Sequence, residues 1–164
     1  MEQALTIAET GHLCLATLHT NNAYQAIERI VNFFPEEFHA QTRLNLSMNL
    51  KAIVSQRLIP SMKGGLVPAL EILVNQALVR EQIQKGDYEK IPEVMEQNNG
   101  IGMCTFDQSL LALYAQGHIT EETAVSQSDK SSDMAVKIRQ FKLGKGGSFN
   151  DMVDTSNLKM SDAY

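Results

Sequence analysis

Residues 12–19 form an almost unbroken apolar run that is bracketed by two histidines. Because both faces of such a run are apolar, it predicts a central strand of a parallel sheet that is covered on both sides. In sheets of this kind ligands bind beyond the carboxyl ends of the strands, which is where His19, Thr20 and Asn21 lie. We therefore expect this strand to carry part of a ligand site.

The two histidines of this run have different expected roles. His12 and His19 are seven positions apart, which is roughly 23 Å along a strand, and they point to opposite faces. They cannot share a metal ion, and we expect no metal site. His19 is the better ligand contact, with the hydroxyls of Thr17 and Thr20 nearby. His12 is either a structural hydrogen-bonding group or a second functional histidine.

Composition narrows the function classes. The 164 residues fit one ordinary globular domain, with 43% hydrophobic and 20% charged residues. A net charge of −5 argues against nucleic acid as the main partner, since phosphate binding requires a basic face. No apolar run reaches the ~20 residues of a membrane span, so we expect no direct membrane insertion. The two cysteines, Cys14 and Cys104, are expected to be reduced thiols in the cytosol.

Periodicity and capping signals place the expected elements. Thr105 and Gln108 form a capping-box pattern, and residues 63–65 form a glycine turn between two strands. The expected helices are 2–9, 22–34, 36–54, 76–85, 88–97, 105–116, 120–127 and 131–142, and the expected strands are 12–19, 56–60 and 67–74.

The three expected strands form too small a sheet for the expected helices. An interior parallel strand such as 12–19 needs parallel neighbours on both sides, and only two further strands are expected. We therefore expect an α/β fold with an incomplete sheet, the carboxyl part of a larger domain. The expected organisation is a core portion over 1–75, a helical subdomain over 76–143 and a flexible tail over 144–164. No G-x-x-x-x-G-K-[ST] motif occurs, so the chain alone should not hydrolyse a nucleotide.

Five segments of the sequence are typical of a known family. They are Ala8–Leu13, Ala16–Asn21, Phe33–Pro35, Val54–Leu58 and Gly102–Leu110. In this order they resemble the histidine box and later motifs of type IV pilus and type II secretion ATPases, above all the twitching-motility PilT/PilU branch. The residues of the first segments are most similar to the PilU-like members, and the resemblance covers about residues 1–130.

The resemblance implies a RecA-like P-loop ATPase domain that works as a ring-shaped hexamer at the cytoplasmic face of the inner membrane. His19 and His12 would be the catalytic histidines of the box, and Thr17, Thr20 and Arg57 would bind nucleotide. ATP and Mg would be bound by the complete protein, with neither expected for this chain alone. The implied partners are identical subunits, or a paralogous retraction ATPase in a mixed ring, and an inner-membrane pilus platform protein.

Residues 78–87 correspond to the family motif that is tied to retraction, with Arg80, Ile83 and Gly86 agreeing fully. The family places its phosphate loop (Walker A) and Walker B segment before the helix that begins this chain. The expected function is therefore the C-terminal portion of a retraction motor, inactive alone. The alternative is a non-enzymatic helical module that docks on motor rings or on the pilus platform.

Overall fold

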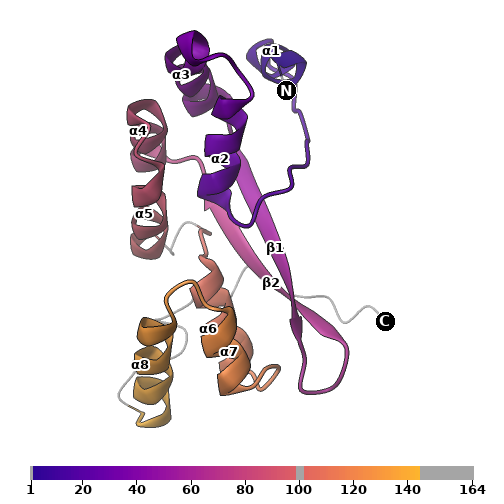
Figure 1. Ribbon diagram of the computed structural model, residues 1–164, viewed down its shortest axis with the longest axis vertical. Helices are drawn as coiled ribbons and strands as arrows, with labels where there is room; N and C mark the ends of the chain where they lie inside the picture. The colour runs from indigo at the N-terminus through magenta and orange to yellow at the C-terminus, as the bar shows by residue number, and fades with distance from the viewer. Residues whose placement is uncertain (1, 99–101, 145–164) are drawn as a thin grey trace. The chain divides into compact units, whose positions relative to one another are not determined.

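The computed structural model describes residues 2–98 and 102–144, and within them the chain forms eight α-helices, two short 3-10 helices and one two-stranded sheet (Figure 1). The first half contains α1 (Glu2–Glu9), α2 (Ala23–Asn32), η1 (Glu36–Phe38), α3 (His39–Asn49), β1 (Ala52–Pro60) and β2 (Leu66–Val74). The second half contains α4 (Ala77–Lys85), η2 (Tyr88–Lys90), α5 (Ile91–Gln97), α6 (Phe106–Ala115), α7 (Glu121–Gln127) and α8 (Ser131–Lys142).

The strands β1 and β2 are consecutive and pair with each other as a long hairpin (Figure 1). The predicted glycine turn joins them: Gly64 and Gly65 have φ of 87° and 72°, the left-handed region that glycine adopts without steric cost. Along β2 the side chains alternate between buried and half-buried, with Val67, Ala69 and Leu73 on the buried face. This period of two confirms the strand prediction.

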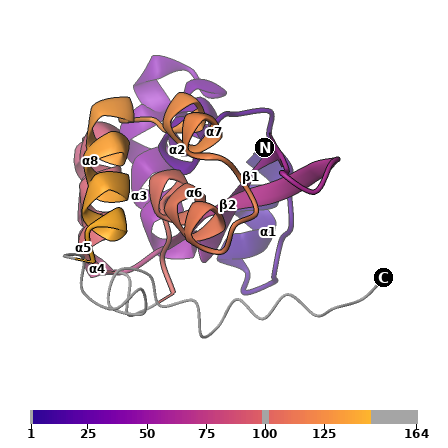
Figure 2. The same ribbon diagram turned by 90° about the horizontal axis from the view of Figure 1, so that it is seen from below.

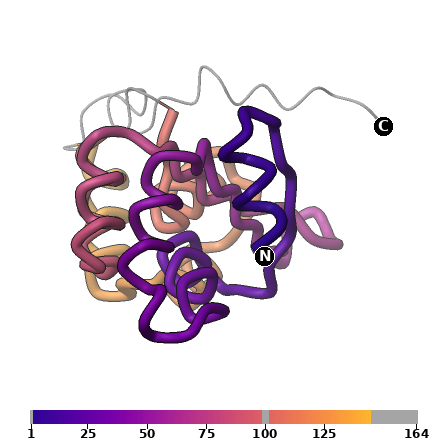
Figure 3. Tube along the Cα trace, turned by 90° about the horizontal axis from the view of Figure 1, so that it is seen from above, coloured from indigo at the N-terminus to yellow at the C-terminus, as the bar shows by residue number. Residues whose placement is uncertain are grey.

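The chain divides into two compact units. Unit 1 comprises residues 1–55 and 72–97, so it includes α1 to α5 and the open end of the hairpin. Within it, α3 packs against α1, α2 and α4, and the indigo α1 lies beside α3 in Figure 3. Its buried side chains come mainly from α2, α3, α4 and α5: Ala23, Ala26, Ile27, Ile30, Val31, Leu46, Val79, Ile83, Ile91 and Met95.

Unit 2 comprises residues 56–71 and the described residues from Asn98 onward. Helices α6, α7 and α8 pack against one another in pairs, and they lie together in the view of Figure 2. With the turn end of the hairpin they enclose a continuous apolar cluster, so this unit has a core of its own. The cluster consists of Ile59, Val67, Ala69, Phe106, Leu110, Leu111, Leu113, Ile119, Ala124, Met134 and Ile138.

This division differs from the expected boundary near residue 75, because each hairpin strand contributes to both units. The expected tail over 144–164 lies outside the described residues except for Gly144. None of the helices in the described ranges is both long and apolar enough to cross a membrane.

The expected strand over 12–19 is wrong for this structure, because residues 12–20 have no regular secondary structure. The preceding helix does end as predicted, with the Gly11 amide donating to the Ala8 carbonyl and φ of 89° at Gly11. The apolar side chains that follow stay in contact with solvent: Leu13 is 77% and Leu15 is 91% exposed. A strand needs a hydrogen-bonded neighbour, and the one sheet of the described residues contains only β1 and β2.

The helix expected over 36–54 is also partly wrong. It begins with η1 and α3 but ends at Asn49, and residues from Ala52 onward belong to β1. The side-chain amide of Asn75 donates to the carbonyls of Ser47 and Leu50, both at 2.8 Å, and so satisfies backbone groups at the helix end. Pairing with β2 then decides the conformation of the β-branched residues Ile53 and Val54.

Candidate functional site

The end of the histidine-bracketed segment borders a polar depression in unit 1, with a volume of about 320 Å³. The Arg29 guanidinium donates a 3.0 Å hydrogen bond to the His19 carbonyl and thereby ties the segment to α2. Asn22 caps the same helix, since its side-chain oxygen accepts from the Gln25 amide at 3.0 Å. The depression is lined by His19, Thr20, Asn21, Gln25, Glu28, Arg29 and Asn32.

The structure brings together only part of the predicted histidine-box set. His19 and Thr20 line the depression, whereas Thr17 and His12 are exposed outside it. The Nδ1 atom of His12 is 2.9 Å from the hydroxyl oxygen of Thr10, a hydrogen bond that favours a local structural role. Among the described residues no group of three or more His, Cys, Asp and Glu side chains could hold a metal ion.

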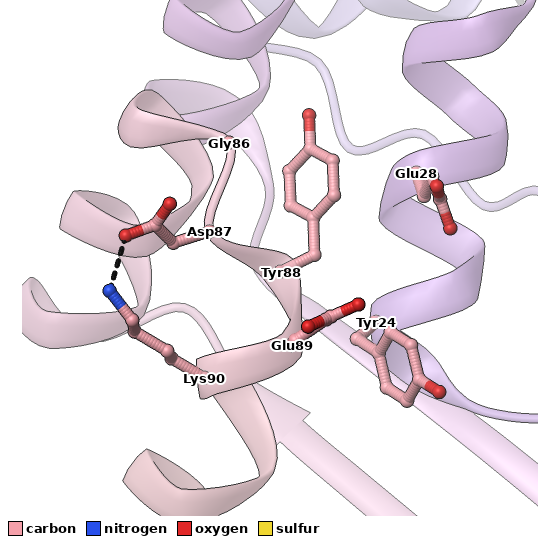
Figure 4. A pocket seen from close by; sticks show the side chains of 7 residues that line it. All are labelled: Tyr24, Glu28, Gly86, Asp87, Tyr88, Glu89 and Lys90. Atoms are coloured by element: carbon pink, nitrogen blue, oxygen red, sulfur yellow. Dashed lines mark hydrogen bonds and ion pairs between the residues drawn. The ribbon is translucent and has the colours of Figure 1, made fainter.

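A second pocket, of about 310 Å³, lies between α2 and the segment that follows α4 (Figure 4). The sequence predicted no site there, although Gly86 and Asp87 belong to the motif over residues 78–87. Asp87 and Lys90 form an ion pair across 2.6 Å at one side of it. Burial is the main cause that raises the pKa of the Tyr88 phenol, and the Arg43 guanidinium opposes this rise. The pocket is lined by Tyr24, Glu28, Gly86, Asp87, Tyr88, Glu89 and Lys90.

The three residues of the retraction motif have different environments on α4. Ile83 is fully buried in the core of unit 1. Gly86 ends the helix in the left-handed conformation, with φ of 80°. A side chain at this position would contact Arg43, because its Cβ would lie 3.6 Å from the Arg43 Cδ. Arg80 is exposed, and no ion pair of the described residues includes it. Of these three residues, only Arg80 therefore presents its functional group to solvent.

Arg57, which was expected to bind nucleotide, has its contacts within unit 2. Its guanidinium carbon lies 3.9 Å above the centre of the Phe106 ring. The same group donates to an Asp129 carboxylate oxygen at 2.9 Å and to the Gln127 carbonyl at 3.3 Å. A stacked and ion-paired arginine of this kind holds β1 against α6 and the loop before α8.

The motif residues 102–110 begin α6 in unit 2. The predicted capping box is present: the Thr105 hydroxyl accepts from the Gln108 amide, and the Gln108 side chain accepts from the Thr105 amide. Asp107 is buried, and its carboxylate accepts from the Asp129 amide at 2.8 Å. This motif therefore organises the fold of unit 2 rather than a solvent-facing site.

The family model described as "Type II/IV secretion system protein" matches residues 1–108. The chain is 42% identical to the type IV pilus ATPase PilU of Pseudomonas aeruginosa, over 99% of this chain and 43% of that protein. It is 40% identical to the type IV pilus retractation ATPase PilT of the same organism, over 74% of this chain and 35% of that protein. The chain thus spans less than half the length of the curated relatives it matches.

Solved structures agree with these similarities. The crystal structure of the pilus retraction motor PilT with bound ADP superimposes with a TM-score of 0.71 at 40% identity, covering 80% of this chain and 37% of that one. The ATPase DotB of Yersinia pseudotuberculosis superimposes with a TM-score of 0.64 at 27% identity, covering 75% of this chain and 32% of that one. The architecture is therefore that of part of a RecA-like ATPase.

Proposed function

The chain belongs to the family of type II/IV secretion system proteins, and on that premise we propose that it is the C-terminal portion of a motor ATPase that drives pilus retraction. The relatives that match it over most of its length are pilus ATPases, and PilT is described as a pilus retraction motor. The observation that carries the proposal is the polar depression at the end of the histidine-bracketed segment, which offers His19 and Thr20 to a ligand.

In this proposal His19 contacts the terminal phosphate of ATP, with Thr17 and Thr20 as hydrogen-bond donors and His12 as the first histidine of the box. The described residues do not fit Mg-ATP by themselves. The sequence lacks a phosphate loop, and the described residues include no cluster of three metal-ligating side chains. In this proposal the chain contributes these groups to a site whose phosphate and metal ligands come from outside the residues of this chain.

Nucleotide contact by Arg57 would compete with its present contacts. Its guanidinium would have to leave both Asp129 and the ring of Phe106. Nucleotide binding should then loosen the loop before α8, which amide hydrogen exchange at Asp129 and Lys130 can measure. No change in exchange at these amides would remove Arg57 from the nucleotide site.

We also propose that Arg80 is the part of the retraction motif that touches a partner, because Ile83 is buried and Gly86 ends the helix. The proposed assembly is a ring of six identical subunits, or a mixed ring with a paralogous ATPase, at the cytoplasmic face of the inner membrane. The partner there is the pilus platform protein. Arg80→Ala should reduce retraction while leaving ATP turnover within about twofold of the parent protein.

The direct test fuses this chain to the part of PilU that the match does not cover and measures ATP turnover. His19→Ala should lower kcat by about 10²–10³, the usual loss when one group that stabilises developing charge is removed. His118→Ala is the matched control, since His118 is a half-buried residue of unit 2. Unchanged turnover in the His19 variant would contradict the proposed role.

The separate core of unit 2 favours one alternative, a docking module without enzymatic activity. Such a module should melt cooperatively as the isolated chain, with no effect of ATP, and should bind motor rings or the platform. A chain that aggregates when isolated but assembles into a nucleotide-dependent ring when fused to that part of PilU would exclude this alternative.

A further inference from the structure

The pocket between α2 and the segment after α4 lies within unit 1, and the proposed function does not use it. Its volume of about 310 Å³ is at the lower end of the range of small-molecule sites. Each of two elements contributes one tyrosine and one glutamate to its lining, Tyr24 and Glu28 from α2 and Tyr88 and Glu89 from η2 (Figure 4). The pocket thus combines aromatic surface with carboxylates.

The charges of the lining are only partly neutralised. Asp87 and Lys90 form an ion pair with each other. Glu28 and Glu89 are exposed, and neither takes part in an ion pair found among the described residues. Figure 4 shows Glu89 extending from η2 toward α2, the helix that carries Glu28. The pocket therefore has an excess of negative charge that comes from two different elements.

The tyrosine rings add a second kind of attraction for a cation. Tyr24 and Tyr88 are half-buried, and the face of an aromatic ring attracts an ammonium group within about 6 Å. The Arg43 guanidinium interacts with the Tyr88 phenol and supplies positive charge there. A bound cation is therefore expected beside Tyr24 and the two glutamates, with apolar groups against Tyr88.

This combination of groups favours an organic polycation over other cations. A divalent metal ion takes oxygen ligands, so it would use the carboxylates alone. A lysine or arginine side chain carries one positive charge, so it would neutralise only one of the two glutamates. A methylene chain with an ammonium group at each end uses both carboxylates and both rings.

We propose that this pocket binds a linear polyamine. One ammonium group pairs with Glu28 and lies against the Tyr24 ring. A second pairs with Glu89, and the methylene chain between them covers the Tyr88 ring. Glu28 also lines the depression beside His19, whereas Glu89 does not, so variants at Glu89 test this site separately from the proposed nucleotide contact.

Titration of the full 164-residue chain with spermidine, a linear polyamine, tests the proposal in the absence of nucleotide. Calorimetry should show one molecule bound per chain, and the ring resonances of Tyr24 and Tyr88 should shift saturably in nuclear magnetic resonance spectra. Tyr114 is the internal control, since its ring packs edge-on against Phe141 in unit 2 and should not shift.

Glu89→Lys should weaken spermidine binding about tenfold, because it replaces an attraction with a repulsion of similar size. The matched control is Glu93→Lys, which makes the same charge change at an exposed residue of α5 outside the pocket lining. It should change the affinity less than about twofold at physiological ionic strength, where charges are screened over about 8 Å. Tyr24→Leu should weaken binding about threefold through loss of the ring face.

Four outcomes would overturn the proposal. If the Tyr24 ring shows no saturable shift up to about 10 mM spermidine, the pocket binds no polyamine. Equal weakening by Glu89→Lys and Glu93→Lys would mean that spermidine responds only to the net charge. Displacement of spermidine by an equal concentration of Mg²⁺ would assign the pocket to a metal ion. Butylamine has the single ammonium group of a lysine side chain and should bind at least tenfold more weakly, so an equal affinity would assign the pocket to a lysine of a protein partner.

Discussion

Two stretches of this chain are similarly apolar but have different structures. Residues 66–74 form β2, in which Val67, Ala69 and Leu73 are buried. Residues 12–20 form no strand, and Leu13 and Leu15 are 77% and 91% exposed. The difference lies in the neighbours, because β2 pairs with β1 and has its inner face covered by an apolar core.

This contrast separates two requirements for a buried strand, namely burial of its apolar side chains and pairing of its backbone. Apolar side chains favour burial by about 25 cal/mol per Å² of surface removed from water, whatever surface covers them. A strand also needs partners for its backbone amides and carbonyls, and these partners come from other segments. Residues 12–20 have apolar side chains but no neighbouring strand among the described residues.

The largest expected effect compares side-chain truncation in the two stretches. Ile59→Ala on β1 removes a side chain that is 1% exposed, so it should lower the free energy of unfolding by about 2–4 kcal/mol. Leu15→Ala should change it by less than about 0.5 kcal/mol, because Leu15 is 91% exposed. Urea denaturation measures both. A cost above 1 kcal/mol for Leu15→Ala would mean that the segment is packed in solution.

The two cysteines report on the same contrast through their reactivity. Burial, and to a lesser extent the Glu71 carboxylate, raises the pKa of Cys104 to about 11, so only about one thiol in a thousand is ionised at pH 8. Cys14 lies in the unpaired segment and is half-buried. Iodoacetamide should therefore modify Cys14 at least 100-fold faster than Cys104, as followed by mass spectrometry. Comparable rates would show that unit 2 opens readily.

Fusing this chain to the part of PilU that the match does not cover should sharpen this measurement. If a neighbouring strand covers residues 12–20, the rate at Cys14 should fall at least tenfold while the rate at Cys104 stays the same. A Cys14 rate that does not change in the assembled protein would contradict the idea that this segment completes a sheet there.

A smaller effect is expected where β1 is held against α6. Arg57→Lys keeps the positive charge but loses the planar stacking on Phe106, so it should cost about 1 kcal/mol of unfolding free energy. Arg80→Lys is the control, since Arg80 is an exposed residue of α4, and it should cost less than about 0.5 kcal/mol. Equal costs for the two variants would mean that the stacking contributes nothing.

The smallest effect is a pH dependence of unit 2. Burial is the main cause that raises the pKa of Asp107 above its ordinary value of 3.8, and the neighbouring Asp129 carboxylate adds to the rise. Because the folded state binds this proton more tightly, the stabilising contribution is present below pH 3.8 and is lost as the pH rises through the folded-state pKa. Asp107→Asn should remove this part of the pH dependence of unfolding. A profile that keeps its slope in the variant would assign the dependence to other groups.

Local signals in the sequence identified most elements of the structure. The capping box at Thr105 and the glycine turn between the strands act within a few residues, and each lies where the pattern placed it. A ligand site at His19 was expected from a strand that the structure lacks, so the depression that His19 borders leaves this site a prediction. The pocket around Tyr88 was not predicted, because its side chains come from positions far apart in the chain.

The amino-acid sequence by itself determined most helix starts, the turn of the hairpin and the family to which the chain belongs, because these depend on neighbouring residues or on ordered motifs. Only the tertiary structure decided that Arg57 stacks on Phe106, that β1 begins at Ala52, and that residues 12–20 remain unpaired. These three outcomes depend on which distant segments are present to supply a ring, a neighbouring strand or a covering surface. Burial and backbone pairing are properties of contacts between segments, so a pattern within one segment cannot fix them.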